Sequence, residues 1–99
     1  MLRSAIAVMF MAGLSLPALA SNAYTFETAE PVNKRRVVAE SVVWTCEGTV
    51  CRGELARRAP TVRICKKIAR EVGVVTSLRN TNAELTEAEL AECNTAVRR

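Results

Sequence analysis

Four cysteines, Cys46, Cys51, Cys65 and Cys93, are the feature that most constrains the fold of this 99-residue chain. A domain of this size buries little apolar surface, so it usually needs covalent crosslinks or a bound metal to remain folded. Disulfides persist in oxidising compartments, whereas a reducing compartment favours free thiols or metal sites. The fold prediction therefore depends first on where the protein is located.

The first twenty residues have the organisation of a secretory signal peptide. Arg3 gives a positive start, residues 5–16 are almost entirely apolar, and the small-x-small pattern ends at Ala20. The apolar run is about a dozen residues, whereas a membrane-spanning helix needs roughly 20. We therefore expect cleavage after Ala20, a periplasmic or secreted location, and no transmembrane segment in the mature chain.

Cleavage leaves 79 residues, which is enough for one domain. Residues 21–34 are polar and include Pro31, which argues against a central strand. We predict that 21–34 form a loosely held N-terminal arm or a short edge strand. Residues 35–99 are expected to form a small disulfide-stabilised domain.

The composition excludes several kinds of chemistry. The chain has no His, and all 10 of its acidic residues are Glu. Without His, neither a Ser-His nor a Cys-His nucleophile pair can be assembled, and histidine metal sites are excluded. Paired glutamates could perform acid–base chemistry, but they fall mostly on predicted exposed faces. We therefore predict no catalytic residues, no metal site and no cofactor, and we do not expect an enzyme.

The net charge is mild. Removing Arg3, the only charged residue of the signal, lowers the formal charge from +4 to +3. Nucleic-acid binders are usually much more basic, so no nucleic-acid partner is expected.

The segment from Val37 to Cys51 is expected to form strands, because it is rich in β-branched residues. Alternation places Trp44 and Cys46 on the same face, which we take as the core side. Trp44 is interpreted as the largest core residue; the alternative is a platform on which a ligand stacks.

Four residues including Gly48 separate Cys46 from Cys51, a spacing that suits a hairpin with the two cysteines facing each other. A redox-active pair is the alternative, but that chemistry favours Cys-x-x-Cys at the start of a helix. A four-cysteine zinc site is a further alternative, although such sites usually contain closely spaced ligand pairs.

Two helices are predicted. The first runs from Pro60 to Val72 and is stopped by Gly73, with Cys65 on its apolar stripe. A strand over 74–78 follows. The second helix begins with the Thr86/Glu89 capping box and the Leu85/Leu90 staple, and it runs to about Val97 with Cys93 inward. Four cysteines permit three pairings. The facing arguments favour Cys46–Cys51 and Cys65–Cys93.

Basic residues are concentrated around the first helix. Seven lie between positions 52 and 71, against two glutamates. Six of them, called here the basic set, are candidate anion-binding residues: Arg57, Arg58, Arg63, Lys66, Lys67 and Arg70. Clustered Lys and Arg attract anionic lipid or other polyanions. The alternative interpretation is the solvated face of a small helix.

The chain also resembles a known family. The residues that carry the resemblance are Trp44-x-Cys46-x-Gly48, Cys51, Pro60, Cys65, Ile68-Ala69, Gly73-x-Val75 and Leu90-x-x-Cys93-Asn94. This pattern is similar to that of small exported alphaproteobacterial proteins that are conserved but uncharacterised. The resemblance implies a bacterial periplasmic or secreted location and brings no activity with it.

Together these observations predict an α+β domain. A small antiparallel sheet over about 35–56 and 74–78 carries two packed helices and two disulfides. The expected function is a non-enzymatic interaction or structural module of the cell envelope, whose partner is an unidentified envelope protein. The alternative is a binder of an anionic surface through the basic set. Thiol exchange at Cys46 and Cys51 is a third hypothesis.

Overall fold

The computed structural model describes residues 22–98. The predicted signal peptide, residues 1–20, and its cleavage site lie outside the described residues.

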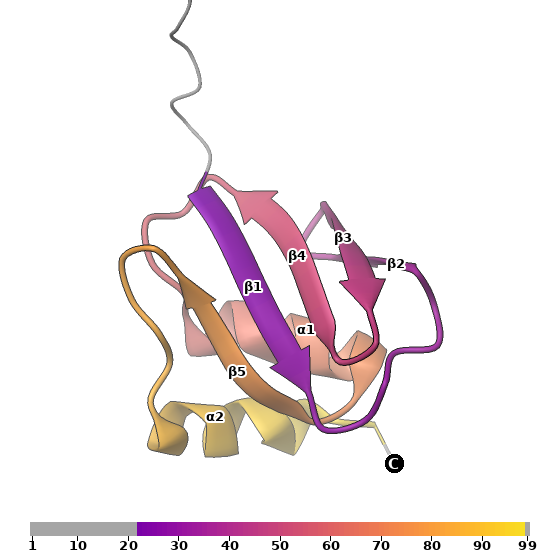
Figure 1. Ribbon diagram of the computed structural model, residues 1–99. Coiled ribbons are helices and arrows are strands. Elements are labelled where there is room, and N and C mark those ends of the chain that lie inside the picture. The colour runs from indigo at the N-terminus through magenta and orange to yellow at the C-terminus, as the bar shows by residue number, and fades with distance from the viewer. Residues whose placement is uncertain (1–21, 99) are drawn as a thin grey trace, which may run out of the picture.

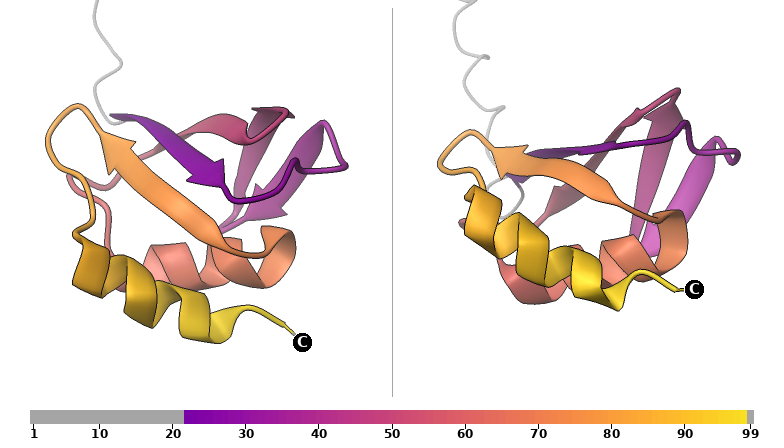
Figure 2. Two further views of the ribbon diagram at one scale, coloured as in Figure 1. Left: turned by 60° about the horizontal axis from the view of Figure 1, so that its bottom comes forward. Right: turned by 90° about the horizontal axis from the view of Figure 1, so that it is seen from below.

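The described chain forms a two-layer α+β domain in which both helices cover the same face of an antiparallel sheet (Figures 1 and 2). The elements are β1 Asn22–Thr28, β2 Arg36–Ala39, β3 Val42–Glu47, β4 Val50–Leu55, α1 Val62–Val72, β5 Val75–Asn80, α2 Glu87–Cys93 and the 3-10 helix η2 Asn94–Ala96. The strand order is β2-β3-β4-β1-β5. The predicted fold class is therefore confirmed.

Strand β1 corrects the prediction of a loose arm. It pairs with β4 on one side and β5 on the other, so it is an interior strand. Its side chains alternate, with Tyr24, Phe26 and Thr28 buried against the helices. Pro31 lies beyond the last β1 residue and does not interrupt the pairing.

Trp44 on β3 lies at the centre of the core. It is fully buried, and its ring meets that of Phe26 edge to face at a centroid distance of 5.0 Å. Its indole Nε1 donates a hydrogen bond of 3.2 Å to the carbonyl oxygen of Ala39. Trp44 is therefore a core residue rather than a ligand platform.

The predicted hairpin and its disulfide are confirmed. Cys46 and Cys51 are directly paired in the β3–β4 register and are bonded to each other. The connecting turn begins with Gly48, whose φ of 63° is in the region that suits glycine. The bridge closes the end of the hairpin and packs into the core.

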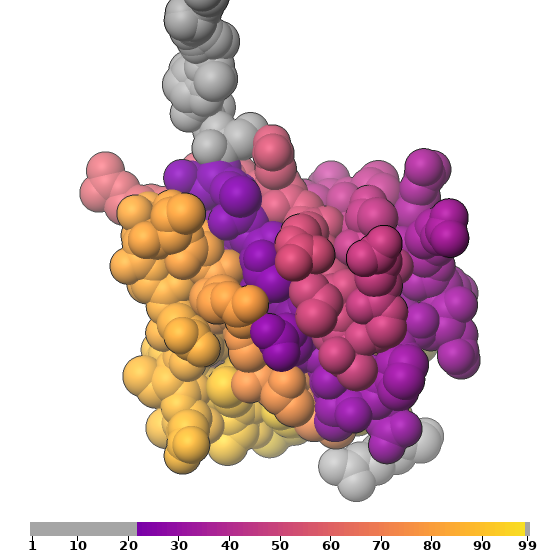
Figure 3. Space-filling model, in the orientation of Figure 1, coloured from indigo at the N-terminus to yellow at the C-terminus, as the bar shows by residue number. Residues whose placement is uncertain are grey.

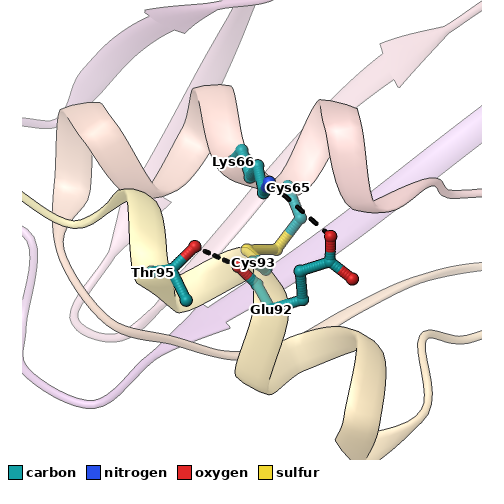
Figure 4. Close-up of polar contacts among 5 residues, drawn as sticks. All are labelled: Cys65, Lys66, Glu92, Cys93 and Thr95. Atoms are coloured by element: carbon teal, nitrogen blue, oxygen red, sulfur yellow. Dashed lines mark hydrogen bonds and ion pairs between the residues drawn. A yellow bond between two sulfur atoms is a disulfide. The ribbon is translucent and has the colours of Figure 1, made fainter.

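Helix α1 begins two residues later than predicted. Pro60 lies before the helix rather than in its first turn, and Thr61 is the N-cap, because the Thr61 hydroxyl accepts a hydrogen bond of 3.2 Å from the backbone N–H of Ile64. Gly73 ends the helix with φ 98°. The buried side of α1 includes Cys65, which is bonded to Cys93 of α2 as predicted (Figure 4).

Helix α2 has the predicted start but ends earlier. Thr86 and Glu89 form the reciprocal capping box, with hydrogen bonds of 2.9 and 3.2 Å. The α-helix ends at Cys93 and the chain continues as η2, whose first residue, Asn94, turns its side chain to β5. There the Asn94 amide accepts from the N–H of Val75 at 2.8 Å and donates to its carbonyl at 2.9 Å.

The two edges of the sheet differ. At the β5 edge, the side-chain amide of Asn94 forms hydrogen bonds with the backbone N–H and C=O of Val75. The N–H of Leu85 donates a hydrogen bond of 3.1 Å to the carbonyl of Leu78. At the opposite edge, β2 pairs only with β3 in the described part of the chain. An unpaired edge is a template for another strand, so this difference bears on function.

The β2–β3 turn places two non-glycine residues in the left-handed region, Glu40 at φ 57° and Ser41 at φ 58°. Glycine adopts this conformation without a steric penalty. We expect Ser41→Gly to raise the free energy of unfolding by about 0.5–1 kcal/mol, measured by urea denaturation of the oxidised mature protein. Ser41→Ala, which keeps the Cβ, is the control and should not stabilise. Equal midpoints for Ser41→Gly and the unchanged protein would contradict the strain argument.

Candidate functional site

The residues of the basic set, on α1 and its preceding loop, have different surroundings in the structure. Lys66 pairs with Glu92 of α2 at 3.7 Å (Figure 4), and Lys67 pairs with Glu40 of the β2–β3 turn at 3.0 Å. Two of the six candidate cations are thus partly neutralised by ion pairs that tie α1 to its neighbours. Arg63 and Arg70 are exposed.

Arg57 and Arg58 lie before the start of α1, in a loop whose backbone is fixed to the far end of the sheet. The carbonyl of Arg57 accepts hydrogen bonds from Asn22 and Tyr24, and the carbonyl of Arg58 accepts from Asn80 and Asn82, all at 2.8–2.9 Å. Arg70 is in the last turn of the 11-residue helix, roughly 12 Å of helix rise beyond the first residue of α1. The basic set therefore does not form one compact anion site.

The Tyr24 hydroxyl donates a hydrogen bond to the carbonyl of Arg57, and the pKa of this hydroxyl tests its burial. Burial raises the pKa of Tyr24 above its usual 10.0, although Asn80 and the charge of Arg57 act in the opposite direction. The folded state therefore favours the neutral phenol, so its contribution to stability is complete below pH 10 and is lost as the pH rises above it.

Because the chain has one Tyr, ultraviolet absorbance of the phenolate reports this group alone. We expect the native protein to titrate above pH 10.0, and the protein in denaturant to return to the ordinary tyrosine value. A native midpoint at or below that of the denatured protein would contradict the burial of this hydroxyl.

The open edge of β2 presents unpaired backbone groups. In the β2–β3 ladder, the N–H of Cys46 bonds to the carbonyl of Arg35 at 2.7 Å. Hydrogen-bonded residues alternate along an antiparallel pair, so Val37 and Ala39 also face β3. The N–H and C=O groups of Arg36 and Val38 consequently point away from the sheet.

A groove follows this edge. One hollow of about 430 Å³ is lined by the loop at Pro31 and Val32, by β2, and by Val72 at the end of α1. A second hollow of about 310 Å³ continues along β2 to Glu40. Val38 and Glu71 line both hollows. We call these adjoining hollows the β2 groove.

Charged side chains surround the β2 groove unevenly. Its cations are Lys34, Arg36, Lys67, Arg70 and Arg98. Its anions are Glu40, which is paired with Lys67, and Glu71. Five cations against two anions give the groove a net charge of +3.

Apolar surface lies beside the groove. Val38 is 62% exposed and its cross-strand partner Val43 is 56% exposed, on the sheet face that the helices do not cover. These two neighbouring valines form a small exposed apolar surface on the edge hairpin. The β2 groove thus combines unpaired backbone groups, apolar contacts and positive charge.

The centre of the open sheet face is a weaker candidate. Figure 3 looks onto this face. The strand register aligns one row across all five strands: Arg36, Thr45, Arg52, Thr25 and Arg79. Three glutamates, Glu27, Glu47 and Glu54, occupy the same face, and Glu27 pairs with Arg79 at 3.0 Å. Equal numbers of arginines and glutamates favour a solvated polar surface over a polyanion site.

The cysteines are positioned for stability rather than exchange. All four are in disulfides, and each is at most 4% exposed. A thiolate in solution must reach the sulfur atom to exchange with it, and burial of Cys46 and Cys51 opposes this. Among residues 22–98, no three Cys or Glu side chains converge as a metal-ligand group. No helix within these residues is long and apolar enough to cross a membrane.

Comparison with known proteins places the chain in a family. A family model described as "Family of unknown function (DUF8200)" matches residues 6–95. The chain belongs to this family. No curated protein and no solved structure matches the chain. Membership of DUF8200 confirms that the resemblance is to an uncharacterised family, and it carries no activity over to the site.

The β2 groove was not identified from the sequence. Lys34, Arg35 and Arg36 directly precede the apolar strand residues, and this run of charge next to a predicted strand was the available signal. That the strand lies at an open edge depends on the order of all five strands, which the local sequence does not specify.

Proposed function

We propose that this DUF8200 protein is an exported, non-enzymatic interaction module that binds a protein of the bacterial cell envelope through the β2 groove. The observation that carries the proposal is the open edge of β2, with unpaired backbone groups at Arg36 and Val38 next to a hollow of about 430 Å³. Strand edges of this kind bind extended segments of partner proteins.

Export is supported by the predicted signal peptide and by the two disulfides. The resemblance to small exported alphaproteobacterial proteins is a further reason, and the family match begins at residue 6, within that predicted signal. The absence of His from the sequence supports a non-enzymatic role.

Site-directed photocrosslinking in cells tests the proposal. A photoreactive side chain in place of Val38 should give a discrete adduct with an envelope protein, whereas one in place of Thr76 on β5 should not. Arg36→Glu should remove the adduct. Arg52→Glu is the matched control, because Arg36 and Arg52 are both exposed and flank Thr45 in the strand register.

Equal adducts from both positions, or an adduct that is insensitive to Arg36→Glu, would overturn the assignment of the binding surface.

The second candidate function is binding to anionic lipid or another polyanion through the basic set. Exposed Arg63 and Arg70 on α1 favour it. Binding to vesicles containing an anionic lipid should then appear at low ionic strength, weaken with added salt, and fall in Arg63→Glu. No binding at low ionic strength would exclude this candidate.

A further inference from the structure

We propose that the partner presents an extended acidic segment, which adds to the sheet as a sixth strand beside β2. This inference rests on the proposed function and specifies the chemistry of the ligand. The segment would alternate β-branched or other apolar side chains with Glu or Asp.

The backbone of β2 requires an extended ligand. Arg36 and Val38 each offer one N–H and one C=O group to the open side, at the two-residue spacing of a strand. Among residues 22–98, none of the backbone hydrogen bonds formed outside helices and strands reaches these groups. A β-strand can satisfy all four groups at once, which a helix cannot do because its own backbone groups are already paired.

The two faces of the docked strand would meet different surroundings. On the helix side lie the partly buried Val32 and Val72, next to the hollow of about 430 Å³. Apolar side chains of the ligand fit there. On the open side lie Val38 and Arg36, whose neighbours on β3 are Val43 and Thr45. Ligand side chains on that face would cover Val38 and approach Arg36.

The positive charge of the β2 groove favours an acidic ligand. Glu40 already neutralises Lys67, whereas Lys34, Arg36 and Arg70 pair with no carboxylate of the described chain. Carboxylates spaced along the ligand would therefore meet cations at both ends of the groove.

A second copy of β2 is the competing occupant. An antiparallel pair through the outward groups would set Arg36 of one copy opposite Val38 of the other, with the two Lys34–Arg36 segments at opposite ends. Each copy would still bring a groove of net charge +3 to the interface, so two copies repel each other whereas an acidic strand is attracted. Charged side chains on an edge strand commonly oppose pairing between copies.

A display library tests the inference on the oxidised mature protein. The probes are random peptides of about ten residues, which is within the usual length of a strand. Selected peptides should be acidic and alternating. Their affinity should fall at least about tenfold with Arg36→Glu, a loss of one charge-assisted contact, and stay within about twofold with Arg52→Glu. Val38→Pro removes an outward N–H without touching the β2–β3 ladder, so it should also abolish binding.

The other possible results would each overturn the inference or assign the edge to a different occupant. Enrichment of basic or neutral peptides, or no enrichment, would overturn the acidic-strand inference, and so would binding that Val38→Pro leaves intact. If a photoreactive side chain at position 38 still crosslinks to an envelope protein in cells, the proposed function would stand although the acidic-strand inference had failed. Concentration-dependent dimers in sedimentation, abolished by Val38→Pro, would assign the edge to a second copy instead. Circular dichroism and urea midpoints of each variant show that a loss of binding is not a loss of folding.

Discussion

The variant C65A/C93A is expected to lose about 4 kcal/mol of unfolding free energy, the largest effect of any change considered for this domain. The reason is the length of chain that the bridge closes. Its cysteines are 28 positions apart, whereas Cys46 and Cys51 are 5 apart. The chain-entropy relation gives about 4 kcal/mol for the longer loop and about 2 kcal/mol for the shorter one.

The position of the bridge adds to this effect. It joins α1 to α2 (Figure 4), and α2 has only seven residues. A helix of this length is unstable in isolation, so its place depends on the bridge, on Asn94 and on the apolar contacts of Leu85 and Leu90.

Urea denaturation of C65A/C93A and C46A/C51A, compared with the unchanged oxidised protein, measures the two losses. The larger decrease in midpoint should belong to C65A/C93A, at a similar denaturant slope. The reverse order would show that the hairpin disulfide contributes more to the free energy of unfolding than the interhelical disulfide does.

Substitution of Gly53 is expected to give the second largest loss, about 2–3 kcal/mol for Gly53→Ala. A Cβ at Gly53 would lie 2.8 Å from Cε3 of Trp44 and 3.1 Å from Cγ1 of Val42. Trp44 has little freedom to move away, because it is fully buried and its Nε1 is bonded to Ala39. The added methyl group must therefore displace the central core residue.

Gly48→Ala is the matched control, since an added Cβ there meets nothing within 4 Å and only the positive φ of 63° opposes it. That backbone penalty is about 1 kcal/mol. The single Trp provides the readout in addition to the urea midpoint. Gly53→Ala should change the fluorescence of Trp44, and Gly48→Ala should not. A smaller loss for Gly53→Ala than for Gly48→Ala would contradict this packing.

The features that the sequence predicted well are local ones. Thr86 and Glu89 specify the start of α2 through atoms three residues apart, and the alternation around Trp44 and Cys46 specifies the inward face of β3. The disulfide pairing could be predicted because each helix has one inward cysteine, and the two remaining cysteines face each other in the hairpin.

The features that it missed depend on residues far apart in the chain. Residues 22–28 became an interior strand because β4 and β5, more than twenty positions away, pair with them on both sides. The partial neutralisation of Lys67 depends on Glu40, which the β2–β3 turn brings to α1. The β2 groove is likewise formed by a loop, an edge strand and a helix end that meet only in the folded domain.

The central claim is that an exported chain is held by two disulfides and so presents a stable open edge. Intact mass spectrometry of the protein isolated from its own cells, after alkylation without reduction, tests this claim most directly. We predict a chain that begins at Ser21, carries no alkyl group, and is four hydrogens lighter than the fully reduced chain. A chain that retains Met1, or one alkylated at all four cysteines, would contradict it.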